Sequence, residues 1–411
     1  MKKTIIFFPI EIGVAHLSRS LAVAEELHAR GNKVLFAIPE RKKHIFASSP
    51  VTFIIIKNLL EQDTLMSVKK LIDANYLKSF IHEDYELIKK YKPDCIVADF
   101  NLSALVAAYA LDVPIVNITG SGALPYGCYI PNPDLNKLLY TFIDLLLNKA
   151  LWNMKSNIAK ALVKNLETYG KKISVNEFFD NMHYIVPEHE GYLQARPGNS
   201  TISYVGPLAW DGFRKKPFAL APSKKKTIYL SFGGTGFDGE KLIELSSKLL
   251  NSGYRVVVSS STIAKAGDFT SHKDLIVAPF VNGQDVSRCV DLVVCHGGYG
   301  TMCDAINAGK PIVAIPFNPD QLLHAFRFQE YGLAVSTINF SPLFLLDFVK
   351  MNWTRFQNLG SDVPTEIIME KIHDVFSNYA SYTRNIQKMK HLFSEEYSVK
   401  KAADLVEKIK G

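Results

Sequence analysis

Cysteine is scarce in this sequence, and the few cysteines follow no bonding pattern. Five are spread over 411 residues, an odd number, and no two stand at the Cys-x-x-Cys spacing. Secreted disulfide frameworks use even sets of cysteines, and structural zinc sites use closely paired ones. Both are therefore disfavoured, and we expect reduced, buried thiols in a cytoplasmic protein.

Long apolar runs are also missing. No segment reaches the ~18 uncharged apolar residues that mark a membrane span; the nearest, 135–152, is interrupted by Asp144 and Lys149. The first ten residues carry two lysines and a short apolar run, but Pro9 and Glu11 break it and no small-residue cleavage site follows. We expect a first buried strand there, not a signal peptide, and at most peripheral membrane contact.

Charge of one sign forms no long block. The formal net charge is +7, but the lysines are scattered, so a nucleic-acid-binding stripe is not indicated. Hydrophobic residues make up 47% of the chain and charged residues 21%, as in globular enzymes and unlike disordered chains. At this length we expect two domains of roughly 150 to 200 residues each.

What the sequence does contain is a regular alternation of strand and helix patterns. In the first half, apolar β-rich runs alternate with segments of helical periodicity. The expected strands are 4–9, 33–38, 51–56, 94–98 and 114–118, and the expected helices are 17–30, 76–91 and 102–111. Because the strands are continuously apolar, we expect a parallel sheet covered by helices on both faces.

The alternation is interrupted once and then restarts. Glycine, prolines and lysines gather between residues 204 and 226, which is typical of a linker. The second half then has expected strands at 227–232, 255–259, 275–277, 291–295 and 311–315, with helices at 241–252 and 301–308. We therefore expect an α/β protein with one domain over 1–208, a linker over 209–226 and a second doubly wound domain from 227.

One loop of the second half has the chemistry to hold a phosphate. Residues 291–304 have the pattern of a strand, a glycine turn and a helix start, and Gly297, Gly298 and Gly300 let the backbone approach an oxyanion. The N–H groups at the helix start favour negative charge, and His296 at the strand end can donate to the same anion.

A structural explanation of this loop stays open, with Thr301 as the helix N-cap and Asp304 completing a capping box. A second glycine turn, 232–236, follows the first strand of the same domain and is expected at the same sheet edge, which adds Gly234 and Thr235 to the candidates. Neither turn matches the GxGxxG fingerprint or a P-loop, so hydride chemistry and ATP hydrolysis are disfavoured.

Several segments of the second half together resemble a known family. They are 278–280, 296–304, 309–313 and 316–321, with weaker echoes at 205–208 and 231–233. In order and spacing they are similar to the donor-binding signature of family 1 glycosyltransferases, the UDP-glucuronosyl- and glucosyltransferase-like group that includes macrolide and antibiotic types.

The resemblance implies the GT-B fold. Two Rossmann-like, doubly wound domains then face each other across a cleft, the N-terminal one binding the acceptor and the C-terminal one, over 227–384, binding the nucleotide sugar. A C-terminal helix, about 385–411, is expected to return to the first domain.

The resemblance also assigns donor-binding roles. The diphosphate is assigned to His296, Gly298, Gly300 and Thr301. Asp304 stands where the family usually has a Glu that binds the ribose hydroxyls.

For the sugar and the base, Asp320 and Gln321 match the acid-amide pair that hydrogen-bonds the sugar hydroxyls. Val277 occupies the place of a Trp that often stacks on the base, so Phe280 or backbone groups of Val281 are the expected substitutes.

In the first domain, His16 follows the first strand and opens the first helix, where an imidazole can remove a proton near neutral pH. Asp99 ends another strand at the same edge and could fix the His16 tautomer. The resemblance implies these two roles for the base and its partner. From the residues alone, His16 could instead be a cap or core histidine, and Asp99 the N-cap of the next helix.

Together these features predict an inverting transfer of a sugar from a nucleoside diphosphate, a UDP-sugar by the family's preference or a TDP-sugar, to a hydroxyl of a small hydrophobic or lipid acceptor. We expect no metal and no cofactor, because no Asp-x-Asp pair stands out. Residues 120–133 and 135–152 are expected to line the acceptor pocket. A nucleotide-sugar epimerase or hydrolase, and a non-catalytic nucleotide-sugar-binding subunit, remain as alternatives.

Overall fold

The computed structural model describes residues 2–11, 14–56, 68–131, 137–210, 212, 218–233, 237–260, 263–278, 281–339 and 359–409. The chain divides into two compact units. Unit 1 comprises Met1–Tyr129, Asn148–Gly212 and Glu395–Gly411, and unit 2 comprises Ile130–Leu147 and Phe213–Ser394.

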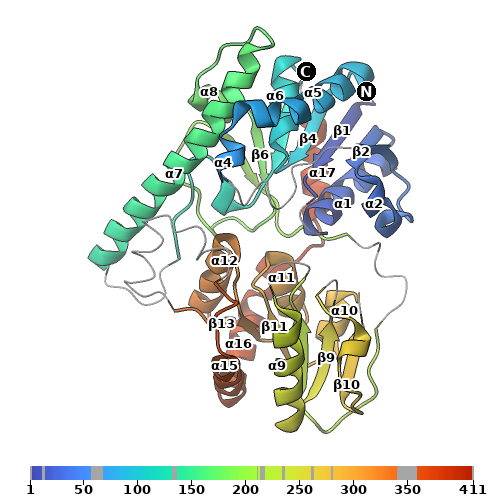
Figure 1. The fold of residues 1–411 in the computed structure, drawn as a ribbon, viewed down its shortest axis with the longest axis vertical. Coiled ribbons are helices and arrows are strands. Elements are labelled where there is room, and N and C mark those ends of the chain that lie inside the picture. Colours follow the sequence, from blue (N-terminus) through green and yellow to red (C-terminus); the bar gives the residue numbers. More distant parts are fainter. Residues whose placement is uncertain are drawn as a thin grey trace. The chain divides into compact units, whose positions relative to one another are not determined.

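The described part of unit 1 is built on a seven-stranded sheet (Figure 1). Its strands are β1 (Thr4–Pro9), β2 (Lys33–Ile38), β3 (Thr52–Ile55), β4 (Cys95–Asp99), β5 (Ile115–Ile118), β6 (His183–Val186) and β7 (Thr201–Tyr204). They pair in parallel in the order β3-β2-β1-β4-β5-β6-β7. The order reverses beside β1, so the carboxyl ends of β1 and β4 lie next to each other, where doubly wound sheets bind ligands.

Helices cover both faces of this sheet, as the continuous apolar strands predicted. They are α1 (Ala15–Ala29), α2 (Glu40–Lys43), α4 (Val68–Leu71), α5 (Ala74–Tyr91), α6 (Leu102–Ala110), α7 (Lys137–Glu167), α8 (Val175–Asp180) and α17 (Ser398–Lys408), with 3-10 turns at His44–Phe46 and Ser121–Ala123.

Alternation along β1 shows how one strand serves two cores. Ile6 and Phe8 are fully buried in a core shared with α5, α6 and α7. Ile5 and Phe7 are fully buried in a second core shared with α1 and α17. Successive strand side chains point to opposite faces, so a strand buried on both sides must be apolar throughout.

The C-terminal helix α17 lies beside α1, although the two are far apart in sequence (Figure 1). Arg30, at the end of α1, donates to Asp404 at 2.5 Å and to Glu407 at 2.9 Å on α17. Ala402, Ala403 and Val406 complete the core beneath. The last helix therefore closes one face of the N-terminal sheet.

Unit 2 repeats the scheme with a six-stranded parallel sheet in its described part. Its strands are β8 (Thr227–Ser231), β9 (Arg255–Ser259), β10 (Leu275–Ala278), β11 (Leu292–Cys295), β12 (Ile312–Ala314) and β13 (Ala334–Ser336), in the order β10-β9-β8-β11-β12-β13. Its helices are α9 (Gly239–Asn251), α10 (Gly283–Arg288), α11 (Tyr299–Asn307), α12 (Pro319–Glu330), α15 (Thr365–Ser377) and α16 (Tyr379–Met389), with 3-10 turns at Ala266–Asp268 and Lys390–Phe393.

The structure differs from the sequence-based expectations at the domain borders. Strands β6 and β7 were not predicted, and Tyr204, which we placed where the linker pattern starts, ends β7. The helix expected over 135–152 is the longer α7, whose first part, up to Leu147, groups with unit 2. The return to unit 1, expected from about 385, begins at Glu395, because α16 packs with unit 2.

All five cysteines are free thiols, and four of them are buried. Within the described ranges, no helix is long and apolar enough to cross a membrane.

A buried carboxyl between α5 and α6 makes the stability of unit 1 depend on pH. Asp84 is 2% exposed and accepts a hydrogen bond from Ser103 Oγ at 2.6 Å. Burial raises the pKa of Asp84 from 3.8 to about 7. Because the folded-state pKa lies above the unfolded one, the stabilising contribution is complete below pH ~4 and is lost as pH rises toward 7.

We predict that Asp84→Asn removes this loss, since an amide stays neutral and can still accept from Ser103. The stability of the variant relative to the native chain should rise from pH 4.5 to 7.5, by at most ~1.4 kcal/mol per pH unit. Urea unfolding at several pH values measures this difference. A difference that stays constant with pH would contradict the assignment.

Candidate active site

The N-terminus of α1 places His16 at the carboxyl edge of the unit 1 sheet. His16 is the second residue of α1, and its side chain is 24% exposed. Val14 occupies the N-cap position, and the helix has no side-chain cap among the described residues. His16 is therefore neither a helix cap nor a fully buried core residue.

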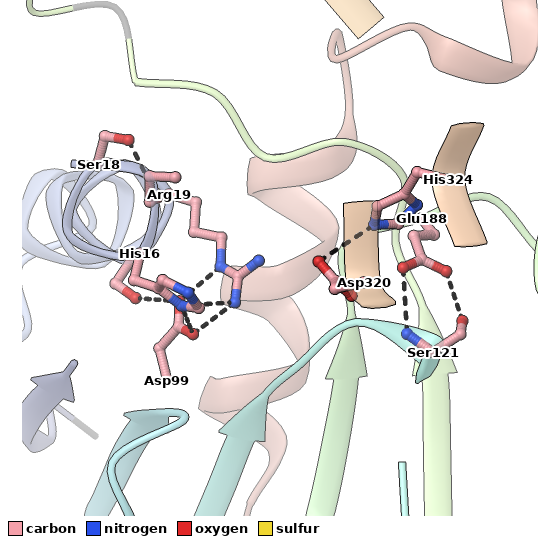
Figure 2. Close-up of polar contacts among 10 residues, drawn as sticks. His16, Ser18, Arg19, Asp99, Ser121, Glu188, Asp320 and His324 are labelled. Atoms are coloured by element: carbon pink, nitrogen blue, oxygen red, sulfur yellow. Dashed lines mark hydrogen bonds and ion pairs between the residues drawn. The ribbon is translucent and has the colours of Figure 1, made fainter. Parts of the chain in front are cut away.

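Asp99, the last residue of β4, is fully buried and lies against His16 (Figure 2). His16 Nδ1 is 2.7 Å from Asp99 Oδ1. The next helix, α6, is capped by Asn101, whose side chain accepts from Ala104 N. The alternative that Asp99 is this N-cap is therefore wrong, and its carboxylate belongs to the histidine instead.

Two further side chains of α1 bind the same carboxylate (Figure 2). Arg19 donates through Nε to Oδ2 at 2.6 Å and through Nη2 to Oδ1 at 2.5 Å, and Ser20 Oγ donates to Oδ2 at 3.0 Å. Burial alone would raise the pKa of Asp99, but the charges of Arg19 and His16 outweigh it and hold that pKa well below its usual range. Asp99 is thus an anion surrounded by donors.

An ionised carboxylate can only accept hydrogen bonds, which fixes the proton on the imidazole. The short contact to Asp99 requires the hydrogen on Nδ1 of His16. In the neutral ring, Nε2 then carries the lone pair. His16 therefore has the tautomer that a general base needs, with Nε2 as the accepting atom.

Other buried carboxylates hold the loops at this edge of unit 1. Glu11, just after β1, is 8% exposed and forms a two-pronged ion pair with Arg41 of α2, at 2.6 Å for each contact. Glu188, after β6, accepts from both the backbone N–H and the hydroxyl of Ser121, after β5 (Figure 2). Glu11 after β1, and the loops that follow β5 and β6, are thereby held by charge-assisted hydrogen bonds.

In unit 2, the loop between β11 and α11 has the form expected of a phosphate loop. Gly298 is the N-cap of α11, with no side-chain cap recorded within the described residues, whereas Asn282 and Asn318 cap the neighbouring α10 and α12. Thr301 lies inside α11, so the alternative in which Thr301 caps the helix and Asp304 completes a capping box is wrong. The first N–H groups of α11 keep their capacity to bind an anion.

The glycines of this loop are required by its geometry. Gly297 has φ of 79°, and a Cβ there would lie 2.9 Å from the Gln321 carbonyl oxygen. A Cβ at Gly298 would lie 2.4 Å from Nε2 of His296. The His296 ring thus lies against the start of α11, and the first turn of α12 packs on the same loop.

His296 is held by the end of β8. Its Nδ1 is 3.3 Å from the carbonyl oxygen of Ser231, at the end of β8, so Nδ1 carries the hydrogen in this contact. A Cβ at Gly233 would lie 3.6 Å from the His296 ring. Burial lowers the pKa of His296. Gly233, the first glycine of the second turn, and Gly298 of the first turn therefore both lie at this ring, whereas 234–236 lie outside the described residues.

Three of the predicted donor residues, Gly234, Thr235 and Phe280, lie outside the described residues. Asp304, one turn into α11, has its carboxylate next to the start of α10, where a Cβ at Gly283 would be 2.7 Å from Asp304 Oδ2. Val281 lies two residues before that glycine and is partly exposed. The structure therefore brings the predicted ribose and base segments together.

The acid-amide pair at the start of α12 is split between two environments. The Asp320 side chain is 65% exposed, and its Oδ2 is 3.6 Å from Nε2 of the buried His324 (Figure 2). Gln321 is 6% exposed, and its Oε1 accepts from Phe317 N at 2.8 Å. Only the NH2 end of Gln321 is thus suited to bind a sugar hydroxyl.

Three site residues were missed in the sequence. Arg19 and Ser20 stand three and four positions after His16, and His324 stands four positions after Asp320. Residues at these spacings share one helix face. That spacing was the available signal, but it acquires meaning only once Asp99 is known to lie beside α1.

A protein-family model matches part of unit 2. Residues 249–338 match the model of the glycosyltransferase family 28 C-terminal domain. The match covers most of the unit 2 sheet and both the phosphate loop and the start of α12, the segments that carry the family resemblance in the sequence.

Curated relatives and solved structures extend the similarity over most of the chain. A PGL/p-HBAD biosynthesis rhamnosyltransferase of Mycobacterium bovis is 24% identical over 81% of this chain and 76% of its own. The glycotransferase of kitacinnamycin has a TM-score of 0.72 at 16% identity, with 99% of this chain and 98% of that one covered. UGT71G1 of Medicago truncatula, complexed with UDP-glucose, has a TM-score of 0.65 at 17% identity, with 98% of each chain covered.

At such low identities the solved structures establish the fold, which is the two-sheet GT-B architecture. The family match and the curated relatives add the activity class. Together with two parallel α/β units, they identify this chain as a glycosyltransferase of the GT-B type.

Proposed function

We propose that the protein transfers a sugar from a nucleoside diphosphate to a hydroxyl group, with inversion at the anomeric carbon. Nε2 of His16 takes the acceptor proton while the acceptor oxygen attacks. The bond from the anomeric carbon to the diphosphate breaks in the same step, and the nucleoside diphosphate leaves with the bonding electrons. A single displacement of this kind needs no covalent enzyme intermediate.

The observation that carries the proposal is the His16–Asp99 contact at 2.7 Å. It fixes the proton on Nδ1 and leaves a basic nitrogen on a partly exposed ring. A buried histidine with both nitrogens bonded would have no such capacity.

The donor half of the proposal is supported by unit 2. Nε2 of His296 and the first N–H groups of α11 lie together at the end of β11, where the developing charge of a diphosphate would be stabilised. The carboxylate of Asp304 is suited to ribose hydroxyls, and Asp320 with the Gln321 amide to sugar hydroxyls. We include no metal ion in the reaction, because the leaving-group charge is assigned to these donors.

For the base and the acceptor, the proposal is a uridine diphosphate sugar, with thymidine diphosphate sugars as the alternative, and a small hydrophobic or lipid alcohol or phenol. A hydrolase or epimerase would use the same donor residues. Product analysis separates the three activities, because a hydrolase releases free sugar and an epimerase changes the donor without any acceptor.

Incubation with a panel of sugar nucleotides tests the function directly. We expect one UDP-sugar or TDP-sugar to raise the melting temperature by several degrees at ~100-fold excess over Kd, since such binding adds ~2.7 kcal/mol. The same donor should then glycosylate a member of a phenol and alcohol library. Absence of stabilisation by every sugar nucleotide would refute a nucleotide-sugar-binding role.

If His16 is the general base, its removal should lower turnover without changing the affinity for the donor. His16→Ala should lower kcat by roughly two to four powers of ten, the usual contribution of a general base, with donor affinity unchanged. Transfer is followed by release of nucleoside diphosphate, and donor affinity by calorimetry. Unchanged turnover in this variant would remove His16 from the mechanism.

The state of His296 predicts that donor binding consumes a proton. In the free protein its Nδ1–H is used on Ser231 and burial lowers its pKa, so Nε2 must gain a proton to donate to a diphosphate. Affinity for the donor should therefore fall as pH rises through the range between the free and bound pKa values, by up to ~10-fold per pH unit.

Calorimetry measures this effect with the stabilising sugar nucleotide from the panel. It is carried out in the His16→Ala variant, so that protonation of His16 does not contribute to the pH dependence. His296→Gln, whose amide donates at every pH, should bind more weakly at pH 6 and show a flat profile. A steep profile that persists in His296→Gln would assign the proton to another group.

A further inference from the structure

Arg19 is the one strong cation that the described contacts place on the His16–Asp99 pair (Figure 2). Its guanidinium forks onto both oxygens of Asp99, and its Nη2 also lies 3.0 Å from Nδ1 of His16. Because the Nδ1 hydrogen is already donated to Asp99, this last contact is not a hydrogen bond. It places a permanent positive charge against the imidazole ring.

The charge balance around His16 follows from the elements packed against it. Asp99 on β4 contributes one negative charge and Arg19 on α1 one positive charge. Near the end of β1, the carboxylate of Glu11 is matched by Arg41 of α2. The negative charge that would favour a protonated His16 is therefore balanced before the imidazole takes up any proton.

We propose that Arg19 is a positioning residue of the catalytic centre, which holds the Asp99 carboxylate in place and, by its charge, opposes a second positive charge on the His16 ring. The inference rests on the proposed function and adds Arg19 to the His16–Asp99 pair as a third residue of the site. The fork is a geometry that lysine cannot reproduce, whereas the charge is one that it can.

Two substitutions separate the parts of this role. Arg19→Met keeps much of the alkyl stem and removes both the charge and the fork. The charge of Asp99 is then opposed only by a protonated His16, so His16 should hold its proton more tightly in this variant than in the native protein, with a higher titration midpoint. Arg19→Lys keeps the charge and should leave the midpoint near the native one, while turnover falls because the carboxylate is less well oriented.

The titration can be followed in the free, full-length protein by NMR, with 13C label at the Cε1 position of histidine. The chain has 11 histidines, so the His16 signal is assigned by its loss in His16→Gln. Arg30→Met is the matched control: it removes an arginine at the far end of the same helix, ~20 Å away and beyond the screening length. Its His16 midpoint should equal that of the native protein.

Activity gives a second readout once a donor and acceptor are known. The acid limb of kcat/KM against pH should move to higher pH in Arg19→Met, so that more activity is lost at acidic than at alkaline pH. A purely structural role for Arg19 would lower activity equally at both ends of the pH profile. Circular dichroism confirms that each variant is folded, and Arg19→Gln replaces Arg19→Met if the latter is not.

A His16 midpoint that is the same in the native protein and in Arg19→Met, or Arg19→Gln, overturns the proposal. A raised midpoint in the charge-removing variant, with the native value in Arg19→Lys, supports it. The NMR result does not depend on any sugar transfer, so a native protein that titrates as expected but transfers no sugar would refute the function while leaving the charge arrangement standing.

Discussion

The buried negative charge of Asp99 is the constraint on which the arrangement of unit 1 depends. An isolated carboxylate at zero exposure would cost many kcal/mol in lost hydration, so it must be surrounded by donors or become protonated. His16, Arg19 and Ser20 supply those donors from one helix. Three properties therefore depend on one another: the position of α1 on the sheet, the tautomer of His16 and the ionisation of Asp99.

Unit 2 has the same kind of parallel sheet, but different polar groups lie at its carboxyl edge. Among the described residues at the end of β11 no carboxylate is buried. The polar groups there are the first N–H groups of α11, which are donors, and His296, whose pKa is lowered by burial and whose Nε2 becomes a donor once it gains a proton. Gly297 and Gly298 keep side chains out of this place. Unit 1 thus carries its own buried anion beside the proposed base, whereas the proposed anion site of unit 2 is lined by backbone N–H groups and a histidine.

The sequence predicted the elements whose pattern is local. Strands β1, β2 and β9 were predicted at their observed bounds, because buried parallel strands are continuous apolar runs and stand out from the amphipathic helices between them. Strands β6 and β7 are less apolar: His183 begins β6, and Thr201 and Ser203 lie within β7, so no continuous apolar run marked them. Their place in the sheet comes from long-range pairing.

For the site, too, local patterns could be predicted and long-range contacts could not. His16, Asp99 and His296 could be proposed because each stands at the end of an apolar strand or at the helix start after one, and parallel strands end at a common edge. The caps could not be assigned, because Asn101 and Gly298 take that role for reasons of local backbone geometry. Arg19 could not be assigned either, since its partner lies eighty positions away in the sequence.

The segment that we expect to contact the acceptor shows how such a scaffold can be selective. Residues 121–126 carry no regular strand, yet Ser121 binds Glu188, Tyr126 donates to Asp180 at 2.8 Å, and Lys155 donates to the Leu124 carbonyl at 2.6 Å. Burial lowers the pKa of Lys155 to about 8, so holding this ammonium against carbonyl groups has a cost that the hydrogen bonds offset. A loop fixed by three separate polar contacts loses little entropy on binding, which favours an acceptor that matches its shape over one that must reshape it.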